Sequence, residues 1–133
     1  MNYKPITILA ISIFLTGCSP YQLTVDDYMK AAPSISLDMT KSEVIKILTP
    51  SQRRLKNTSI KQPDMYKKEG VLVEVLYFRS GWQSDGITTD DEFTPYVFND
   101  GRLVAIGWAV LGGAKSQGQA RSNTTIQNTT IVY

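Results

Sequence analysis

Two groups of side chains in this sequence are candidates for chemistry. The first is the thiol of Cys18, which is the only cysteine in the chain. The second is a run of carboxylates that could serve in acid–base catalysis or bind a hard cation such as calcium: Asp85, Asp90, Asp91 and Glu92. The chain contains no histidine, so it lacks the commonest general base and the commonest zinc ligand.

The carboxylate run has neither the spacing of an EF-hand calcium loop nor a nucleophile or oxyanion hole marked beside it. We therefore interpret it as a solvated loop in which Asp and Thr side chains form turns. The sequence predicts no catalytic residue, no metal site and no cofactor.

Cys18 follows features that are typical of a secretory signal peptide. Lys4 supplies a positive charge, residues 6–15 are mostly apolar, and Gly17 is a small residue at a cleavage position. The apolar stretch is shorter than the roughly 20 residues that span a bilayer as a helix.

The segment Leu15-Thr16-Gly17-Cys18 resembles the lipobox of bacterial lipoproteins. In that family a peptidase cuts before the cysteine, and acyl chains such as palmitate are attached to it. The resemblance implies that residues 1–17 are removed and that Cys18 is anchored in a membrane through lipid. The alternative is ordinary secretion with a free thiol.

In the same family the residue after the cysteine influences sorting, and an aspartate there tends to retain the protein at the inner membrane. This chain has Ser19, which implies the outer membrane, facing the periplasm, in preference to the inner membrane. The formal net charge is only +2, and Lys4 would leave with the signal peptide. Such a chain has no overall field to attract nucleic acid, so we exclude that class of partner.

Two helices are expected in the N-terminal half, after a short tether over residues 18–24. The first is Thr24–Ala32, capped by Thr24 and ended by Pro33. The second begins with a capping box, in which the side chains of Thr40 and Glu43 bond each other's backbone N–H groups.

We expect the second helix to end at Pro50 and the basic stretch Ser51–Gly70 to form a long loop. The lysines of this loop are either simply solvated or in contact with anionic lipid or an acidic partner. Three strands then follow, of which the last two are joined by a tight Asn99-Asp100-Gly101 turn: Val71–Arg79, Phe93–Phe98 and Arg102–Trp108.

These elements predict an α+β domain over residues 25–111, in which two N-terminal helices pack on a three-stranded antiparallel β-meander (ααβββ). Residues 112–133 are rich in Ser, Gln, Asn and Thr and have too few apolar side chains to order themselves. We expect this polar tail to be disordered.

The motifs in this domain resemble the SmpA/OmlA (BamE-like) family of small outer-membrane lipoproteins. The resemblance is carried by Met39-Thr40-x-x-Glu43-Val44, by Tyr77-Phe78-Arg79 and by the Thr94–Val104 hairpin. Asp38 and Thr49 stand where that family has glycine. The stretch Ser84–Pro95 also resembles lipoproteins of the same fold that are uncharacterised. The resemblance implies the ααβββ fold and an accessory role in outer-membrane or envelope assembly.

The aromatic residues outnumber what one small core needs, so they either fill a second cluster or form an exposed patch. We take four residues as candidates for binding a partner: Trp82, Asp85, Tyr96 and Trp108. The sequence thus predicts a non-enzymatic, membrane-anchored interaction module that binds an envelope protein. The alternative is a periplasmic ligand-binding or inhibitor lipoprotein, which a concave aromatic pocket would favour.

Overall fold

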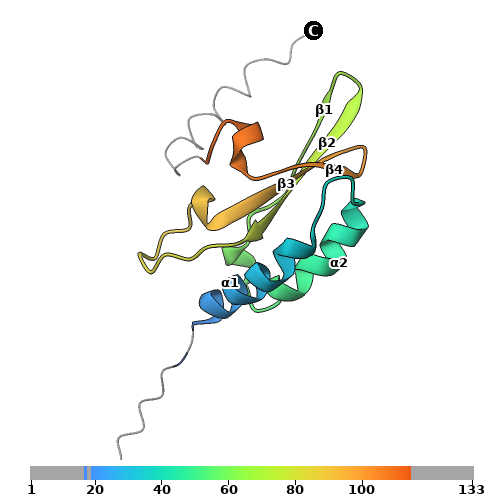
Figure 1. The fold of residues 1–133 in the computed structure, drawn as a ribbon. Coiled ribbons are helices and arrows are strands. Elements are labelled where there is room, and N and C mark those ends of the chain that lie inside the picture. Colours follow the sequence, from blue (N-terminus) through green and yellow to red (C-terminus); the bar gives the residue numbers. More distant parts are fainter. Residues whose placement is uncertain (1–16, 18, 115–133) are drawn as a thin grey trace, which may run out of the picture.

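The computed structural model describes residues 17 and 19–114, so Cys18, most of the predicted signal peptide and most of the polar tail lie outside the described residues. Two helices, α1 (Pro20–Ala31) and α2 (Lys41–Gln52), lie against one face of an antiparallel sheet (Figure 1). The strands form a meander in the order β1-β2-β3-β4: Asp64–Lys68, Val71–Arg79, Phe93–Asn99 and Arg102–Ile106. The predicted α+β class is confirmed, but the sheet has four strands rather than three.

The additional strand, β1, lies within the segment that we predicted to be a loop. It pairs with β2 from Asp64 opposite Val75 to Lys68 opposite Val71. Glu69 and Gly70 join the two strands with φ values of 51° and 84°, as a two-residue hairpin turn requires. Every residue of β1 is exposed, so the strand has no buried apolar face. Strand β1 is therefore held by backbone pairing with β2, and its sequence has no alternating hydrophobic pattern by which a strand could be predicted.

Helix α1 begins earlier than predicted. The Ser19 hydroxyl oxygen accepts a hydrogen bond from the Tyr21 backbone N–H at 3.3 Å, and Pro20 is the first helical residue. Proline suits this position because its missing N–H would have no partner inside the helix. Thr24 is therefore not the cap but a fully buried residue inside the helix. The predicted tether over residues 18–24 is wrong, since only Ser19 separates Cys18 from the helix.

Helix α2 begins with the predicted capping box. The Thr40 hydroxyl oxygen accepts from the Glu43 N–H at 3.3 Å, and a Glu43 carboxylate oxygen accepts from the Thr40 N–H at 2.8 Å. The bonds from the Thr40 side chain and backbone hold the pKa of the Glu43 carboxyl below its ordinary value. The predicted end at Pro50 is wrong, because α2 continues to Gln52. A proline this close to the end removes only one bond of the ladder, and the Ser51 hydroxyl donates to the Leu48 carbonyl at 2.7 Å.

Both faces of the sheet bury apolar side chains. The larger cluster lies between the two helices and the face of the sheet that they cover: Tyr28, Val44, Leu48, Phe78, Tyr96, Phe98 and Leu103. The opposite face, which we call the outer face, carries a smaller cluster of Val73, Val75 and Val97. A 3₁₀ turn, η4 (Trp108–Leu111), follows β4, and Leu111 packs against this second cluster. Strand β2 therefore buries side chains on both of its faces.

The β3–β4 hairpin has the predicted turn but an unexpected irregularity. Asp100 and Gly101 have φ values of 45° and 81°, as in a tight hairpin turn. Phe98 lies opposite Leu103 while Val97 lies opposite Ala105, so β4 has one extra residue at this point. Because of this bulge, Leu103 lies in the helix-side cluster and Ala105 lies on the outer face. Without the bulge, strict alternation would place both side chains on one face.

The third predicted strand is also shorter than expected. Strand β4 ends at Ile106, because Gly107 has a φ of 93° and turns the chain into η4. Trp108 consequently belongs to this 3₁₀ turn and not to the sheet.

Candidate interaction surface

An open groove of about 440 Å³ lies on the outer face of the sheet. Aliphatic side chains form most of its wall, and they come from β2, β3, β4 and η4: Val71, Val73, Val97, Val104, Val110 and Leu111. Tyr66 from β1 adds one aromatic ring. Lys68, Glu69 and Asn99 add polar groups at the same groove. We call this feature the outer groove.

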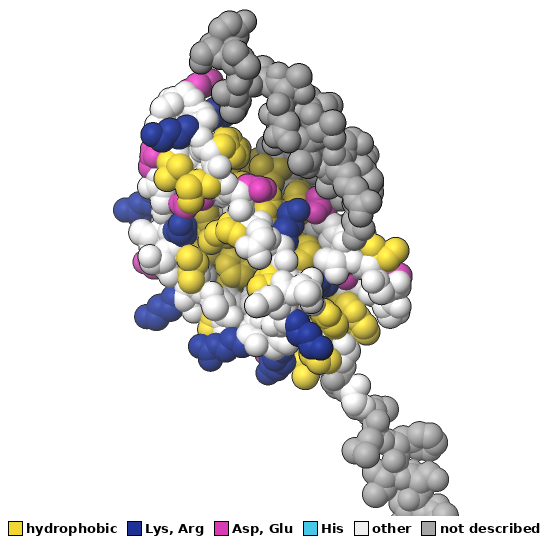
Figure 2. Space-filling view, turned by 180° about the vertical axis from the view of Figure 1, so that it is seen from behind, with side chains coloured by type: hydrophobic (Ala, Val, Ile, Leu, Met, Phe, Trp, Pro, Cys, Tyr) yellow, Lys and Arg dark blue, Asp and Glu magenta, His cyan; other side chains and the backbone are white. Residues whose placement is uncertain are grey.

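The outer groove keeps apolar side chains in contact with solvent. Val110 is 59% exposed, Tyr66 46% and Val104 44%. Figure 2 shows hydrophobic side chains gathered at the middle of the molecule when it is seen from behind, with a few charged side chains among them and more around them. A contiguous apolar surface of this kind on a small domain is typical of a site that binds another molecule.

Sequence reasoning missed the outer groove. Val104 occupies the position of the β4 bulge, Tyr66 belongs to the strand that lacked a hydrophobic pattern, and Val110 follows the end of the sheet. The one usable signal is that Val71–Arg79 has apolar residues on both faces, a pattern that indicates an outer face that is either covered or a binding surface.

Trp108, a predicted partner-binding residue, is half-buried on the outer side of the sheet. Its ring stacks on Tyr77 at a centroid distance of 5.6 Å, and its indole N–H donates to the Phe93 carbonyl at 2.7 Å. The Lys61 ammonium lies 4.8 Å from the centre of the Tyr77 ring. The Tyr77 hydroxyl donates to Asp64 at 2.6 Å, and burial together with this bond raises the pKa of Tyr77. Trp108 thus holds η4 onto the sheet.

Tyr96 cannot serve as a partner-binding residue, because only 1% of it is exposed. The β3 register points it toward the helices, where its hydroxyl is hydrogen-bonded to that of Tyr28 at 2.9 Å. Its ring meets Phe78 edge-on at 5.4 Å. Burial and the bond to Tyr28 raise the pKa of Tyr96. This prediction is wrong, since alternation alone does not tell which face of a strand is covered by helices.

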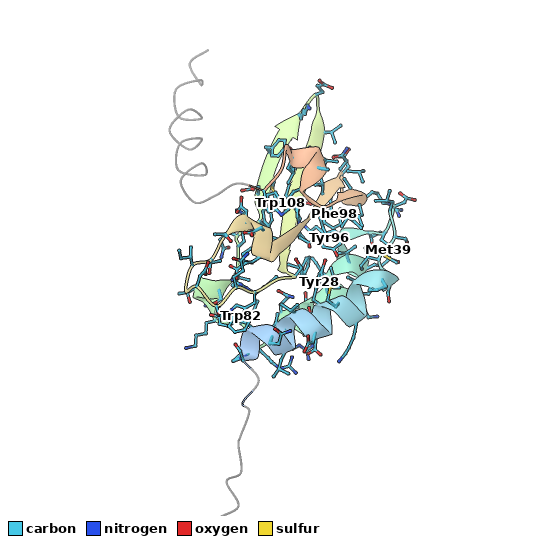
Figure 3. The ribbon with its side chains drawn as sticks, turned by 60° about the vertical axis from the view of Figure 1, so that its left-hand side comes forward. Tyr28, Met39, Trp82, Tyr96, Phe98 and Trp108 are labelled. Atoms are coloured by element: carbon cyan, nitrogen blue, oxygen red, sulfur yellow. The ribbon has the colours of Figure 1, made fainter. Side chains whose placement is uncertain are left out.

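Trp82 lies in the loop between β2 and β3 and is 38% exposed. Its ring stacks on Tyr21 in the first turn of α1, with centroids 6.1 Å apart and planes 7° from parallel. Asp85 is exposed in the same loop, and its carboxylate accepts from the Ile87 N–H at 2.9 Å to form a turn. Figure 3 shows Trp82 beside the start of α1 and well away from Trp108. The four predicted residues therefore do not form one patch.

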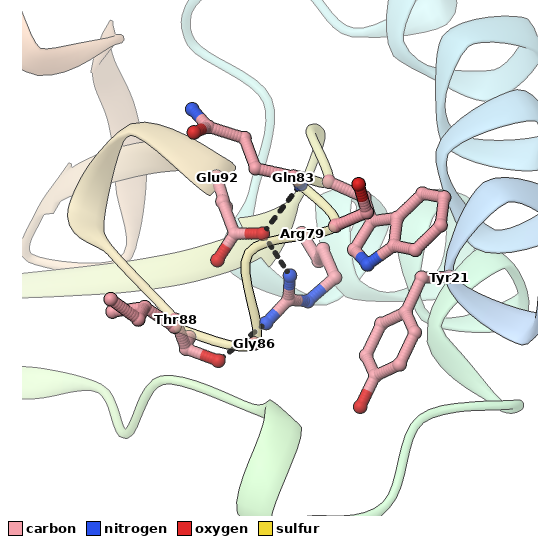
Figure 4. A pocket seen from close by; sticks show the side chains of 9 residues that line it. Tyr21, Arg79, Gln83, Gly86, Thr88 and Glu92 are labelled. Atoms are coloured by element: carbon pink, nitrogen blue, oxygen red, sulfur yellow. Dashed lines mark hydrogen bonds and ion pairs between the residues drawn. The ribbon is translucent and has the colours of Figure 1, made fainter.

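The last member of the carboxylate run, Glu92, is buried with Arg79, the last residue of β2. The Arg79 guanidinium lies 3.0 Å from the carboxylate, and the two side chains are 1% and 2% exposed (Figure 4). The Glu92 oxygens also accept from the backbone N–H groups of Gln83 and Thr89, each at 3.0 Å. Arg79 also donates to the Ser59 carbonyl at 3.3 Å. This buried pair, which we did not predict, fixes both ends of the loop.

The other three carboxylates also bond within or beside the loop. Asp90 pairs with Lys61 at 2.8 Å, Asp91 accepts from the Gln83 side chain at 3.0 Å, and Asp85 forms the turn already described. Across residues 17 and 19–114, no group of three or more His, Cys, Asp or Glu side chains is placed to hold a metal ion. The run therefore builds the loop, although Glu92 is buried where we expected it to be solvated.

No helix within the described part of the chain has the length and apolar character needed to cross a membrane. The apolar residues 6–15 lie outside that part.

Comparison with known proteins identifies the family alone. No curated protein and no solved structure matches the chain. A family model described as "Protein of unknown function (DUF3192)" matches residues 24–112, which include most of α1, all of α2 and the whole sheet. Because this match covers more than half of the sequence, the chain belongs to the DUF3192 family.

Proposed function

We propose that this protein is a bacterial lipoprotein anchored to the outer membrane through lipid on Cys18, where it faces the periplasm. There it acts as a non-enzymatic module that binds an envelope protein, as an accessory in outer-membrane or envelope assembly. The observation that carries the proposal is the outer groove, which keeps apolar side chains such as Val104 and Val110 exposed on an otherwise packed domain.

The composition of the outer groove suits a protein partner. Its wall is mostly aliphatic, and Lys68, Glu69 and Asn99 supply polar groups beside the apolar ones. Protein interfaces commonly combine an apolar centre with a polar rim. A partner segment that presents two or three apolar side chains would fit this surface.

The backbone conformation at Asp38 supports the resemblance to BamE-like lipoproteins. Asp38, which stands where that family has glycine, has a φ of 69° in the left-handed region that glycine adopts most easily. The turn before the Thr40 capping box thus has the conformation for which a glycine would be used.

The second candidate is a lipoprotein that binds a small ligand or inhibits an enzyme. The volume of the outer groove favours it, because about 440 Å³ lies within the roughly 300–1,000 Å³ of small-molecule sites. The lining counts against a glycan, since a single tyrosine provides little aromatic surface for stacking on a sugar ring.

Affinity capture from gently solubilised membranes tests the protein-binding proposal. Val110→Asp places a charge in the outer groove, and we expect it to recover about tenfold less of the partner, equivalent to a loss of about 1.4 kcal/mol. Leu37→Asp is the matched control, because Leu37 is also 59% exposed but does not line the groove. It should recover the partner as the wild type does.

Each outcome of the capture has one interpretation. Equal recovery with Val110→Asp and the wild type would show that the outer groove is not the contact surface. Recovery of no envelope protein by the wild type would count against the assembly role. A small molecule that stays bound to the wild type in native mass spectrometry and is lost from Val110→Asp would support the second candidate.

A further inference from the structure

The linker between Cys18 and the folded domain is very short. Ser19 alone separates Cys18 from Pro20, the first residue of α1, and the Ser19 side chain caps that helix. Two residues span at most about 7 Å. A lipid on Cys18 would therefore hold the first turn of α1 close to the bilayer surface.

The loop that carries Trp82 belongs to this same end of the molecule. Tyr21, in the first turn of α1, stacks on Trp82, and its hydroxyl is hydrogen-bonded to Ser59 at 2.7 Å. Ile87 lines the same small hollow of about 270 Å³ as Tyr21 and Trp82. In Figure 3, Trp82 lies at the end of the molecule where α1 starts.

This end combines exposed apolar and basic side chains. Trp82 is 38% exposed and Ile87 52%. Arg53 follows α2 directly, and Lys56 immediately precedes the 3₁₀ turn that contains Ser59; both are exposed. Figure 2 shows basic and hydrophobic side chains together at the lower end of the molecule, where the described chain begins. We call Trp82, Ile87, Arg53 and Lys56 the anchor-side surface.

Arg53 and Lys56 form no ion pair among the described residues, whereas the carboxylates nearby accept hydrogen bonds or pair with other bases. Asp85 and Asp91 are the exposed acids of the loop; Asp85 accepts the Ile87 N–H in a turn, and Asp91 accepts from the Gln83 side chain. Asp27 on α1 is paired with Arg54, and Asp26 accepts from the Gln22 side chain. Arg53 and Lys56 are therefore available to pair with anionic headgroups, and tryptophan is the side chain most typical of the boundary between lipid and water.

We propose that the anchor-side surface docks on the anionic headgroup layer of the bilayer that holds Cys18. The inference rests on the proposed lipid anchor, and it adds a second contact that orients the domain. The buried Arg79–Glu92 pair supports this role, because it holds the loop in place without help from the membrane.

Docking in this way also sets the position of the outer groove relative to the bilayer. Strand β2 runs from Val71 and Val73, which line the groove, to Arg79 beside the Trp82 loop. Six residues of strand from Val73 to Arg79 span about 20 Å. Figure 1 shows the β1–β2 hairpin at the end of the molecule opposite the start of α1. The groove is then held away from the bilayer, open to a periplasmic partner.

Fluorescence quenching by brominated lipid tests the contact. The acylated full chain is reconstituted into vesicles of phosphatidylethanolamine and phosphatidylglycerol, with and without bromine on the acyl chains. The chain has two tryptophans, so the difference between wild type and Trp82→Phe reports Trp82 without altering Trp108. We expect bromine to lower the Trp82 emission and to leave the Trp108 emission of Trp82→Phe nearly unchanged.

A charge variant checks the electrostatic part. Lys56→Glu should lower the equilibrium constant for docking of Trp82 by about fivefold for each unit of charge changed, since a basic residue near an anionic surface contributes about 1 kcal/mol. Lys46→Glu is the control, because Lys46 lies within α2 and outside the anchor-side surface.

The outcomes separate the docking from the anchor itself. Protein that floats with the vesicles but shows no quenching of Trp82 would overturn the docking and leave the lipid anchor intact. Protein that carries no acyl mass would overturn both. Equal quenching of Trp82 and Trp108 would contradict the proposed orientation.

Discussion

Replacing Arg79 with methionine is expected to lower the free energy of unfolding by about 3–5 kcal/mol. The guanidinium and the Glu92 carboxylate are 1% and 2% exposed and lie 3.0 Å apart. Without Arg79, the carboxylate stays buried with no opposite charge beside it, and that desolvated charge is the source of the loss. Urea unfolding of the purified protein, followed by circular dichroism, measures the change.

Two controls separate the burial of the pair from a simple loss of charge. Arg79→Met combined with Glu92→Met should recover most of the loss, because no unpaired charge remains inside. Arg54→Met breaks the pair with Asp27, whose side chains are 46% and 37% exposed. We expect that variant to lose no more than about 1 kcal/mol. A similar loss for Arg54→Met and Arg79→Met would contradict the account of the loop.

Leu48→Ala is the second large effect, with an expected loss of about 2–5 kcal/mol. Leu48 has no exposed surface and lies in the cluster between the helices and the sheet. Truncation leaves a cavity that the surrounding β-sheet and helices fill only in part. Thermal unfolding of the variant and the wild type measures the difference.

Leu37→Ala provides a control with the same chemistry. Leu37 is 59% exposed, in the segment between the two helices. Surface substitutions of this kind usually change stability by less than about 0.5 kcal/mol. If Leu37→Ala and Leu48→Ala were equally destabilising, the core would not lie where α2 meets the sheet.

Features determined by short-range chemistry could be predicted from the sequence. The Thr40–Glu43 capping box depends on two residues three positions apart, and the Asp100-Gly101 turn depends on two adjacent residues that tolerate positive φ. Val71–Arg79 has the β-branched and aromatic side chains of a strand, and its bounds agree with β2.

The other features depend on partners that are distant in the sequence or on backbone contacts. β1 forms by pairing with β2, without an apolar pattern of its own. Arg79 meets Glu92 because the register of β2 and β3 sets Arg79 opposite Phe93. Tyr96 is buried because the helices cover its face of the sheet, and no local pattern identifies that face. The outer groove also requires a bulge in β4.

The proposed function and the proposed docking assign different contacts to the two ends of the sheet. In the orientation proposed above, the end near Arg79 and Trp82 faces the bilayer, and the outer groove near Val71 and Val73 faces the periplasm. Substitutions at Val110 should therefore change partner recovery without changing the quenching of Trp82. Substitutions at Lys56 should do the reverse.

The most direct test of the central claim is the mass of the N-terminal peptide of protein purified from membranes. The account predicts that Cys18 is the first residue and that it carries the added mass of its acyl chains. Each buried CH₂ group contributes about 0.8 kcal/mol to membrane binding, so two or three chains would hold the protein there essentially permanently. An N-terminus at Met1, or an unmodified Cys18 thiol, would contradict the account.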